Sequence, residues 1–113
     1  MSRVDLRSDT LTLPTDEMRE AMAAAEVGDD VYGEDPTVHR LEEVAAEQVG
    51  MEAALYVPSG AMGNTCAMLS HARHGEEVIF EERAHMFVWE CGAFANIAGL
   101  ASRTLTGPNG IIK

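Results

Sequence analysis

Apolar residues recur with helical spacing near the start of the chain. They stand at positions i, i+3, i+4 and i+7 between Met18 and Ala25, which is the pattern of one apolar helix face. Thr15 lies in front of this run, and threonine is common at a helix N-cap because its hydroxyl accepts a free backbone N–H. The pattern predicts a helix that begins after Thr15 and ends at Gly28.

A second helix is predicted after the polar loop that covers residues 28–36. The pair Asp35-Pro36 places an N-cap residue directly before a proline, which is favoured at the first helical position. Apolar residues between Val38 and Val49 form one face, and Gly50 follows as a stop signal. The helix is therefore expected between these two signals.

Beyond residue 50, short apolar runs alternate with helical segments. The predicted order is a strand at 53–57, a helix at 61–74, a strand at 78–80, a helix at 87–98 and a strand at 102–105. This alternation is typical of an α/β fold with a parallel sheet and right-handed crossovers. Ligands bind beyond the carboxyl ends of such strands, so the segment Ser59–Asn64 and the turn that ends in His85 are the candidate ligand-binding loops.

The expected sheet is unfinished. Three strands leave two open edges, which proteins usually cover or extend. The turn signal Gly107–Gly110 is followed by Ile111 and Ile112, a pattern that resembles the entry to another element. We therefore expect the chain to be the front part of a longer protein, with an incomplete parallel-sheet domain.

The composition narrows the function classes. The 113 residues carry 19 acidic and 8 basic side chains, a formal net charge of -11, and Lys113 is the single lysine. Nucleic acids and anionic membranes repel such a chain, so neither is an expected partner. The N-terminus lacks the apolar stretch of a secretory signal. Cys66 and Cys91 fit a reducing cytoplasm as free thiols, although a single disulfide between them stays open.

Two segments could carry chemistry. Ser59–Asn64 leaves a strand and opens a helix, where free backbone N–H groups and the helix dipole favour an anion such as a single phosphate. The alternative is an ordinary strand-to-helix turn. His85 could stack on an aromatic cofactor or transfer a proton near neutral pH, and the alternative is a surface histidine.

The remaining candidates are weaker on their residues alone. His71 and His74 have a spacing that a metal could use, but no further ligands converge on them in the sequence, so we expect no metal. Ser8 lies in a polar arm, and Tyr32 lies in a loop flanked by glycine. Both residues are surface positions by default, although an aromatic side chain in such a loop is often anchored against a neighbour or a ligand.

Together, these segments resemble the pyridoxal-phosphate (PLP) dependent threonine aldolases of the β-eliminating lyase group. The matching segments, in chain order, are Asp5–Thr10, Pro14–Met22, Val27–Thr37, Pro58–Asn64, His85 and Gly107–Gly110. The resemblance covers essentially the whole chain, and the run from Gly28 to Thr37 is the most specific part of it.

The resemblance implies a fold-type I PLP enzyme that cleaves L-threonine or L-allo-threonine to glycine and acetaldehyde. It implies that residues 1–36 form an N-terminal arm, helix and loop, and that residues 37–113 begin the PLP-binding large domain. It also implies a homotetramer with sites at dimer interfaces. The implied roles are phosphate binding for Ser59, Gly60 and Ala61, stacking on the PLP ring for His85, and substrate contacts for Ser8 and Tyr32.

The sequence also departs from the family pattern. Ala61 stands where threonine is usual, and Phe87 and Trp89 lie where tyrosines are usual. The cofactor-anchoring lysine, the aspartate that faces the pyridine nitrogen and the arginines of the family lie further along the chain, so this chain alone is predicted to be inactive. Two alternatives stay open: another PLP-dependent β-eliminating or carbon–carbon lyase of amino acids, and a non-enzymatic fragment that needs a partner.

Overall fold

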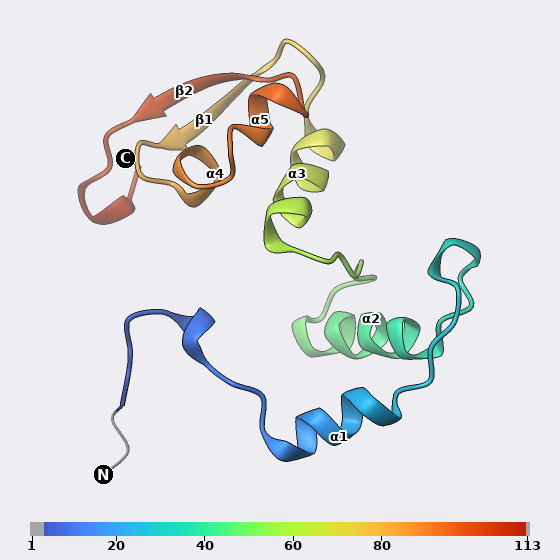
Figure 1. The fold of residues 1–113 in the computed structure, drawn as a ribbon. Helices are drawn as coiled ribbons and strands as arrows, with labels where there is room; N and C mark the ends of the chain where they lie inside the picture. Colours follow the sequence, from blue (N-terminus) through green and yellow to red (C-terminus); the bar gives the residue numbers. More distant parts are fainter. Residues whose placement is uncertain (1–3, 113) are drawn as a thin grey trace. The chain divides into compact units, whose positions relative to one another are not determined.

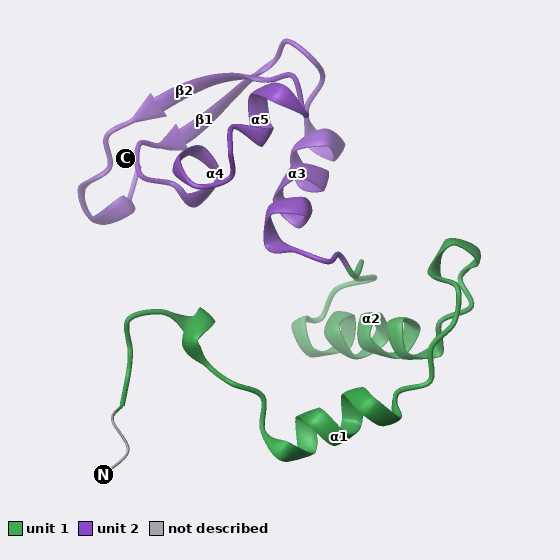
Figure 2. Cartoon of the chain, viewed as in Figure 1, with its two compact units in different colours: residues 1–56 green, residues 57–113 purple. Residues whose placement is uncertain are grey.

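The computed structural model describes residues 4–112 and divides the chain into two compact units, Met1–Tyr56 and Val57–Lys113 (Figure 2). Helices and a parallel strand pair together confirm the expected incomplete α/β fold. The division expected from the resemblance, at residues 1–36 and 37–113, stays a prediction. None of the described helices has the length and apolar character needed to cross a membrane.

The first unit begins with a short 3₁₀ helix, Asp9–Leu11, and helix α1, Asp16–Ala24 (Figure 1). Thr15 caps α1 as expected, with its hydroxyl accepting the Met18 N–H at 3.3 Å. The expected end at Gly28 is wrong. The chain turns extended at Ala25 (φ -60°, ψ 131°), and the Glu26 carbonyl then accepts the hydroxyl of Thr37, eleven residues later, at 2.5 Å.

Helix α2, Pro36–Val49, has the predicted limits. Asp35 is its N-cap, and its Oδ1 accepts the Val38 N–H at 2.9 Å. Gly50 ends the helix in the left-handed region at φ 68°, a conformation that glycine adopts without a steric penalty. These two signals act through local backbone hydrogen bonds, which explains why the sequence predicts both ends.

The predicted strand at 53–57 is wrong. These residues form no strand, and the Tyr56 N–H donates instead to Glu42 Oε1 at 2.7 Å. A strand requires a hydrogen-bonded neighbour. The apolar run alone could not reveal that a side chain of α2 takes one of its backbone donors.

The second unit opens with helix α3, Gly60–His71, capped by Ser59. The helix stops three residues before the expected His74, because Ala72 is already extended at φ -134° and ψ 155°. The Gly75 N–H then donates to the Gly99 carbonyl at 2.8 Å. This contact lies two residues before the first pair of the parallel strands, Glu77 and Ala101, so Gly75 leads into the sheet.

The sheet pairs β1, Glu77–Glu81, with β2, Ala101–Leu105 (Figure 1). The strands are parallel, as predicted, with Glu77 opposite Ala101 and Glu81 opposite Leu105. Within residues 4–112 the sheet has two strands instead of the expected three. The carboxyl end of β1 therefore marks the edge of the sheet at which a ligand is expected to bind. His85 comes shortly after this end of the strand.

The predicted helix at 87–98 is divided into α4, His85–Val88, and α5, Ala93–Asn96. Cys91 and Gly92 separate them in left-handed conformations, at φ 53° and φ 67°. Glycine tolerates this conformation, and two consecutive left-handed residues interrupt a right-handed helix. The prediction continued the helix across Gly92, because the residue types alone do not show that Cys91 also turns left-handed.

The core of the second unit is built on three phenylalanines. Phe80 of β1 lies 5.7 Å from Phe87 of α4 and 5.2 Å from Phe94 of α5, measured between ring centroids. Met68 and Leu100 are buried beside Phe80. This packing fixes α4 against the end of β1, so the segment that carries His85 rests on the best-buried part of the chain.

Candidate functional site

The first part of the candidate site is the start of α3. The Ser59 hydroxyl accepts the Met62 N–H at 3.2 Å, and the Ser59 carbonyl accepts the Gly63 N–H at 3.1 Å. The N–H groups of Gly60 and Ala61 precede the first intrahelical bond, so they remain available to a ligand. A Cβ on Gly60 would have no atom within 4 Å, which shows that this helix start is open. The geometry suits a bound anion.

The two glycines of this segment have different surroundings. A Cβ on Gly63 would lie 3.4 Å from Val57 Cγ2, at van der Waals contact. Gly63 therefore contacts the preceding segment, whereas Gly60 faces open space. Room for a ligand to approach the backbone is therefore present at Gly60 and taken up by Val57 at Gly63.

His85 is the second part of the candidate site. The turn after β1 is closed by the Ala84 N–H, which donates to the Glu81 carbonyl at 2.8 Å, and His85 then begins α4. Its side chain is 73% exposed, and its Nδ1 lies 2.9 Å from Glu90 Oε1. The ring is therefore accessible to a ligand and held at one nitrogen.

Glu90 is a site residue that the sequence reasoning missed. Its side chain is only 2% exposed, and Oε1 also accepts the Asn64 Nδ2–H at 2.7 Å. Oε2 is buried and has no hydrogen-bond partner among residues 4–112. The sequence does contain a sign that Glu90 is unusual. Histidine aside, it is the one acidic or basic residue between Arg83 and Arg103. An isolated charge in an apolar run is costly to bury and therefore informative.

The Asn64–Glu90–His85 network joins the two parts of the site. Asn64 lies one turn into α3, and His85 begins α4, so a single carboxylate oxygen connects the two helices. A hollow of about 580 Å³ adjoins this network. Its mostly apolar lining includes Ala61, Glu90, Trp89 and Ile97.

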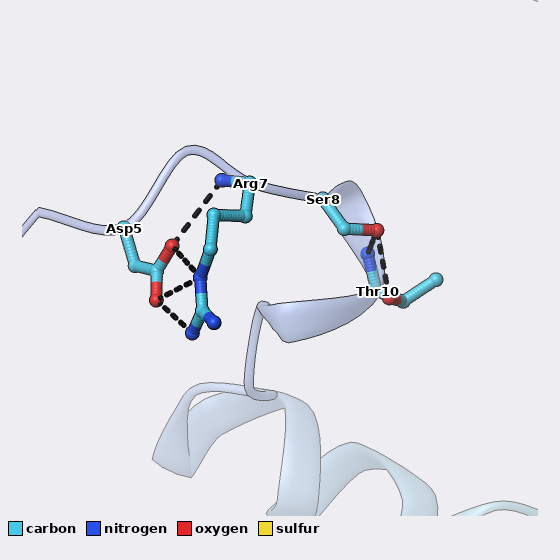
Figure 3. A network of polar contacts seen from close by, with 4 residues as sticks. All are labelled: Asp5, Arg7, Ser8 and Thr10. Atoms are coloured by element: carbon cyan, nitrogen blue, oxygen red, sulfur yellow. Dashed lines mark hydrogen bonds and ion pairs between the residues drawn. The ribbon is translucent and has the colours of Figure 1, made fainter.

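Ser8 lies in the first unit and caps the 3₁₀ helix Asp9–Leu11 (Figure 3). Its hydroxyl accepts the Thr10 N–H at 3.2 Å and lies 2.8 Å from the Thr10 hydroxyl. The neighbouring Arg7 guanidinium pairs with Asp5 at 2.6 Å and holds the pKa of that carboxyl below its usual value. Ser8 thus has a local structural role beside the substrate contact that the resemblance implies.

Tyr32 is presented by a tightly closed loop. The Gly28 N–H donates to Asp35 Oδ2 at 3.0 Å, and the Glu34 N–H donates to the Asp29 carbonyl at 2.9 Å. The N–H of Gly28, followed by that of Val38, lowers the pKa of Asp35. The loop leaves Tyr32 78% exposed, which suits a residue that contacts another group.

The structure brings together Ser59, Gly60, Ala61 and His85 in the second unit, whereas Ser8 and Tyr32 belong to the first. Their joint participation in one site stays a prediction. Among residues 4–112, no group of three or more His, Cys, Asp or Glu side chains is arranged to hold a metal ion. Cys66 and Cys91 are free thiols in the structure.

Comparison with known proteins adds the following similarities. The family model described as beta-eliminating lyase matches residues 5–113. Low-specificity L-threonine aldolase 1 of Arabidopsis thaliana is 53% identical over 106 residues, which are 93% of this chain and 30% of that protein. The low specificity L-threonine aldolase of Escherichia coli K12 is 50% identical over 97 residues, 86% of this chain and 29% of that protein.

A protein of Caenorhabditis elegans called uncharacterized protein R102.4 is 54% identical over 102 residues, which are 90% of this chain and 25% of that protein. The chain therefore spans between a quarter and a third of the length of these relatives.

Proposed function

The chain belongs to the beta-eliminating lyase family, and we propose that it forms the N-terminal, cofactor-binding portion of a PLP-dependent aldolase. The proposed reaction cleaves L-threonine or L-allo-threonine to glycine and acetaldehyde. Two of the similar proteins are low-specificity L-threonine aldolases, which supports this substrate class. The observation that carries the proposal is the open start of α3 tied to His85 through one buried carboxylate.

The residues of the second unit fit the cofactor that this function requires. A phosphate group matches the free N–H groups at the start of α3, and the open space at Gly60 admits its oxygens. We propose that Ser59, Gly60 and Ala61 bind this phosphate, with Ala61 contributing only its backbone N–H. The exposed ring of His85 offers a face for stacking on the pyridine ring. When bound, PLP supplies an electron sink for the bond that breaks.

The chain's own residues then bind and orient the substrate. His85 is proposed to receive the proton of the substrate hydroxyl, a task suited to an imidazole at neutral pH. Ser8 is proposed to contact the substrate carboxylate, and Tyr32 to line the site. Phe87 packs between Phe80 and Phe94. Phe87 is therefore part of the core, and it does not favour the alternative of another PLP-dependent lyase of amino acids, such as one that acts on aromatic substrates.

The assembly and the compartment are also proposals. Large apolar side chains around the hollow are exposed, with Trp89 at 72%, Ile97 at 64% and Leu69 at 52%. Exposed apolar clusters of this kind mark interaction surfaces. This supports a homo-oligomer, which we propose to be a tetramer. The two free thiols support a cytoplasmic location.

The function is tested by assaying the protein that carries this chain, supplied with PLP, against four substrates. We expect acetaldehyde release from L-threonine and L-allo-threonine, weaker cleavage of phenylserine and no breakdown of tyrosine. The 113-residue chain by itself is expected to release no acetaldehyde, because Lys113 is its single lysine and does not match the anchoring position. Preferential breakdown of tyrosine would overturn the aldolase proposal.

The phosphate site is tested by Gly60→Ala. The added methyl meets no protein atom, so the fold and its melting temperature should be unaffected. It would occupy the space in which the phosphate approaches the backbone, and PLP affinity should fall about tenfold, a loss of about 1.4 kcal/mol. Titration of the PLP-free protein with PLP, followed by visible absorption, measures this change.

Gly63→Ala is the matched control for that titration. Its methyl would contact Val57 Cγ2 at 3.4 Å, on the protein side of the helix start. PLP affinity should therefore stay at the unsubstituted value. Equal PLP affinities for the two variants would show that the start of α3 does not bind the phosphate.

A further inference from the structure

We propose that Glu90 is a positioning residue that holds His85 with a proton on Nδ1 and leaves Nε2 free to accept one. The catalytic consequence of this inference rests on the proposed function. The orientation of His85 by Glu90 depends only on contacts within the second unit. It assigns a task to a buried carboxylate that neither the resemblance nor the sequence pattern had identified.

The hydrogen bonds at Glu90 determine where the proton lies. Oε1 accepts from the Asn64 amide at 2.7 Å and lies 2.9 Å from His85 Nδ1. A carboxylate oxygen has no proton to give, so Nδ1 must be the donor in the second contact. A neutral imidazole carries one N–H, and the other nitrogen then holds a lone pair. The lone pair of His85 is therefore on Nε2.

Burial makes Glu90 an effective anchor. The His85 side chain is 73% exposed and would rotate freely without a fixed partner, whereas the Glu90 side chain is 2% exposed. Asn64 holds the same carboxylate from α3, so the His85 ring is oriented relative to the phosphate-binding helix start. An acceptor of this kind selects the tautomer of a histidine and its direction, as second-shell carboxylates do elsewhere.

The second carboxylate oxygen of Glu90 has no hydrogen-bond partner among residues 4–112, and this argues against a purely structural role for Glu90. This oxygen, Oε2, is buried, and Glu90 itself lines a hollow whose other lining residues are mostly apolar. An unpartnered buried polar atom is costly, and an apolar side chain would pack there at lower cost. The carboxylate is accounted for by its contacts with Asn64 and His85, which an apolar residue could not make.

The free Nε2 has a defined task in the proposed cleavage. The substrate hydroxyl transfers its proton to Nε2, and the electron pair of the O–H bond forms the C=O bond of acetaldehyde. The Cα–Cβ bond breaks in the same step, and PLP, if bound by Ser59, Gly60 and Ala61, would supply the acceptor for its electron pair. With the opposite tautomer, Nε2 would carry a hydrogen and could not accept this proton.

The test measures the ring nitrogens of His85 by solid-state ¹⁵N NMR of the whole protein, assigned by difference from a His85→Asn sample. We expect the unsubstituted protein to show a protonated Nδ1 and an unprotonated Nε2. Glu90→Gln keeps an acceptor oxygen, so it should preserve this tautomer and keep kcat for threonine within about tenfold. Glu90→Leu removes the acceptor, so the tautomer should reverse and kcat should fall about 100-fold while KM changes little.

Glu20→Gln on the exposed helix α1 is the matched control for the loss of one charge, and it should change neither readout. A protonated Nε2 in the unsubstituted protein would overturn the inference, and this measurement needs no variant to fold. An unchanged tautomer in Glu90→Leu together with lost stability would also overturn it, since Glu90 would then be structural. The protein could cleave no threonine while the His85 tautomer is kept in Glu90→Gln and reversed in Glu90→Leu. The proposed function would then fail, and the positioning role of Glu90 would be supported.

Discussion

Replacing Gly28 with alanine is expected to destabilise the loop that presents Tyr32 by about 2–3 kcal/mol, the upper part of the range for forced overpacking. A Cβ at this position would lie 2.2 Å from the Glu34 carbonyl oxygen and 2.6 Å from its carbon. Both are backbone atoms, so no side-chain rotation relieves the collision. Relief requires opening the loop, which breaks the 3.0 Å bond between the Gly28 N–H and Asp35.

Urea unfolding of the protein that carries this chain measures the loss in the free energy of unfolding. Gly50→Ala is the comparison, because its methyl meets no atom within 4 Å but must adopt the left-handed region at φ 68°. That conformational strain costs about 1–2 kcal/mol. A smaller loss for Gly28→Ala than for Gly50→Ala would show that the loop yields easily and that the close approach is unimportant.

The starts of α1 and α2 were predicted because their causes are local, and the cap at Ser59, which was not predicted, has the same local cause. Thr15, Asp35 and Ser59 each cap a helix through a hydrogen bond to an N–H three residues ahead. Such a bond needs only the right residue at the right spacing, so the sequence contains the whole signal. The parallel pairing of β1 with β2 was predictable for a related reason, because a crossover through helical segments favours it.

The errors concern interactions between distant positions. The strand at 53–57 failed because the Tyr56 N–H bonds to Glu42, fourteen residues earlier. The helix at 87–98 failed because Cys91 and Gly92 turn left-handed, which lets Phe94 pack against Phe80. Periodicity reports which residues are apolar but not where the chain bends to bury them.

The residues of the candidate site also divide into those that the sequence predicts and those that depend on packing. The sequence and the resemblance named Ser59, Gly60 and His85, and the structure places them in one unit. Glu90 was overlooked because acidic residues are abundant in this chain, and its burial at 2% exposure depends on packing. The informative property was its isolation within an apolar stretch, which distinguishes it from the solvated acidic residues elsewhere.

Replacing His85 with asparagine is expected to reduce kcat/KM for L-threonine by at least about 100-fold, the size of a lost acid–base contribution. The fold should tolerate the change, since the side chain is 73% exposed and, among the described residues, its polar contact is with Glu90. Glu90 keeps its bond from Asn64 in the variant. Acetaldehyde release and thermal unfolding, measured on the same samples, separate lost chemistry from lost structure.

His85→Phe distinguishes the two roles proposed for this residue. Phenylalanine keeps an aromatic face for stacking but cannot accept a proton, so this variant should bind PLP nearly as well as the unsubstituted protein and still fail to cleave threonine. Asparagine lacks the aromatic face, so His85→Asn should lose both properties. His71→Asn, at the exposed end of α3, is the matched control and should retain full activity. Substantial cleavage by His85→Phe would assign the proton transfer to another group and leave His85 with stacking alone.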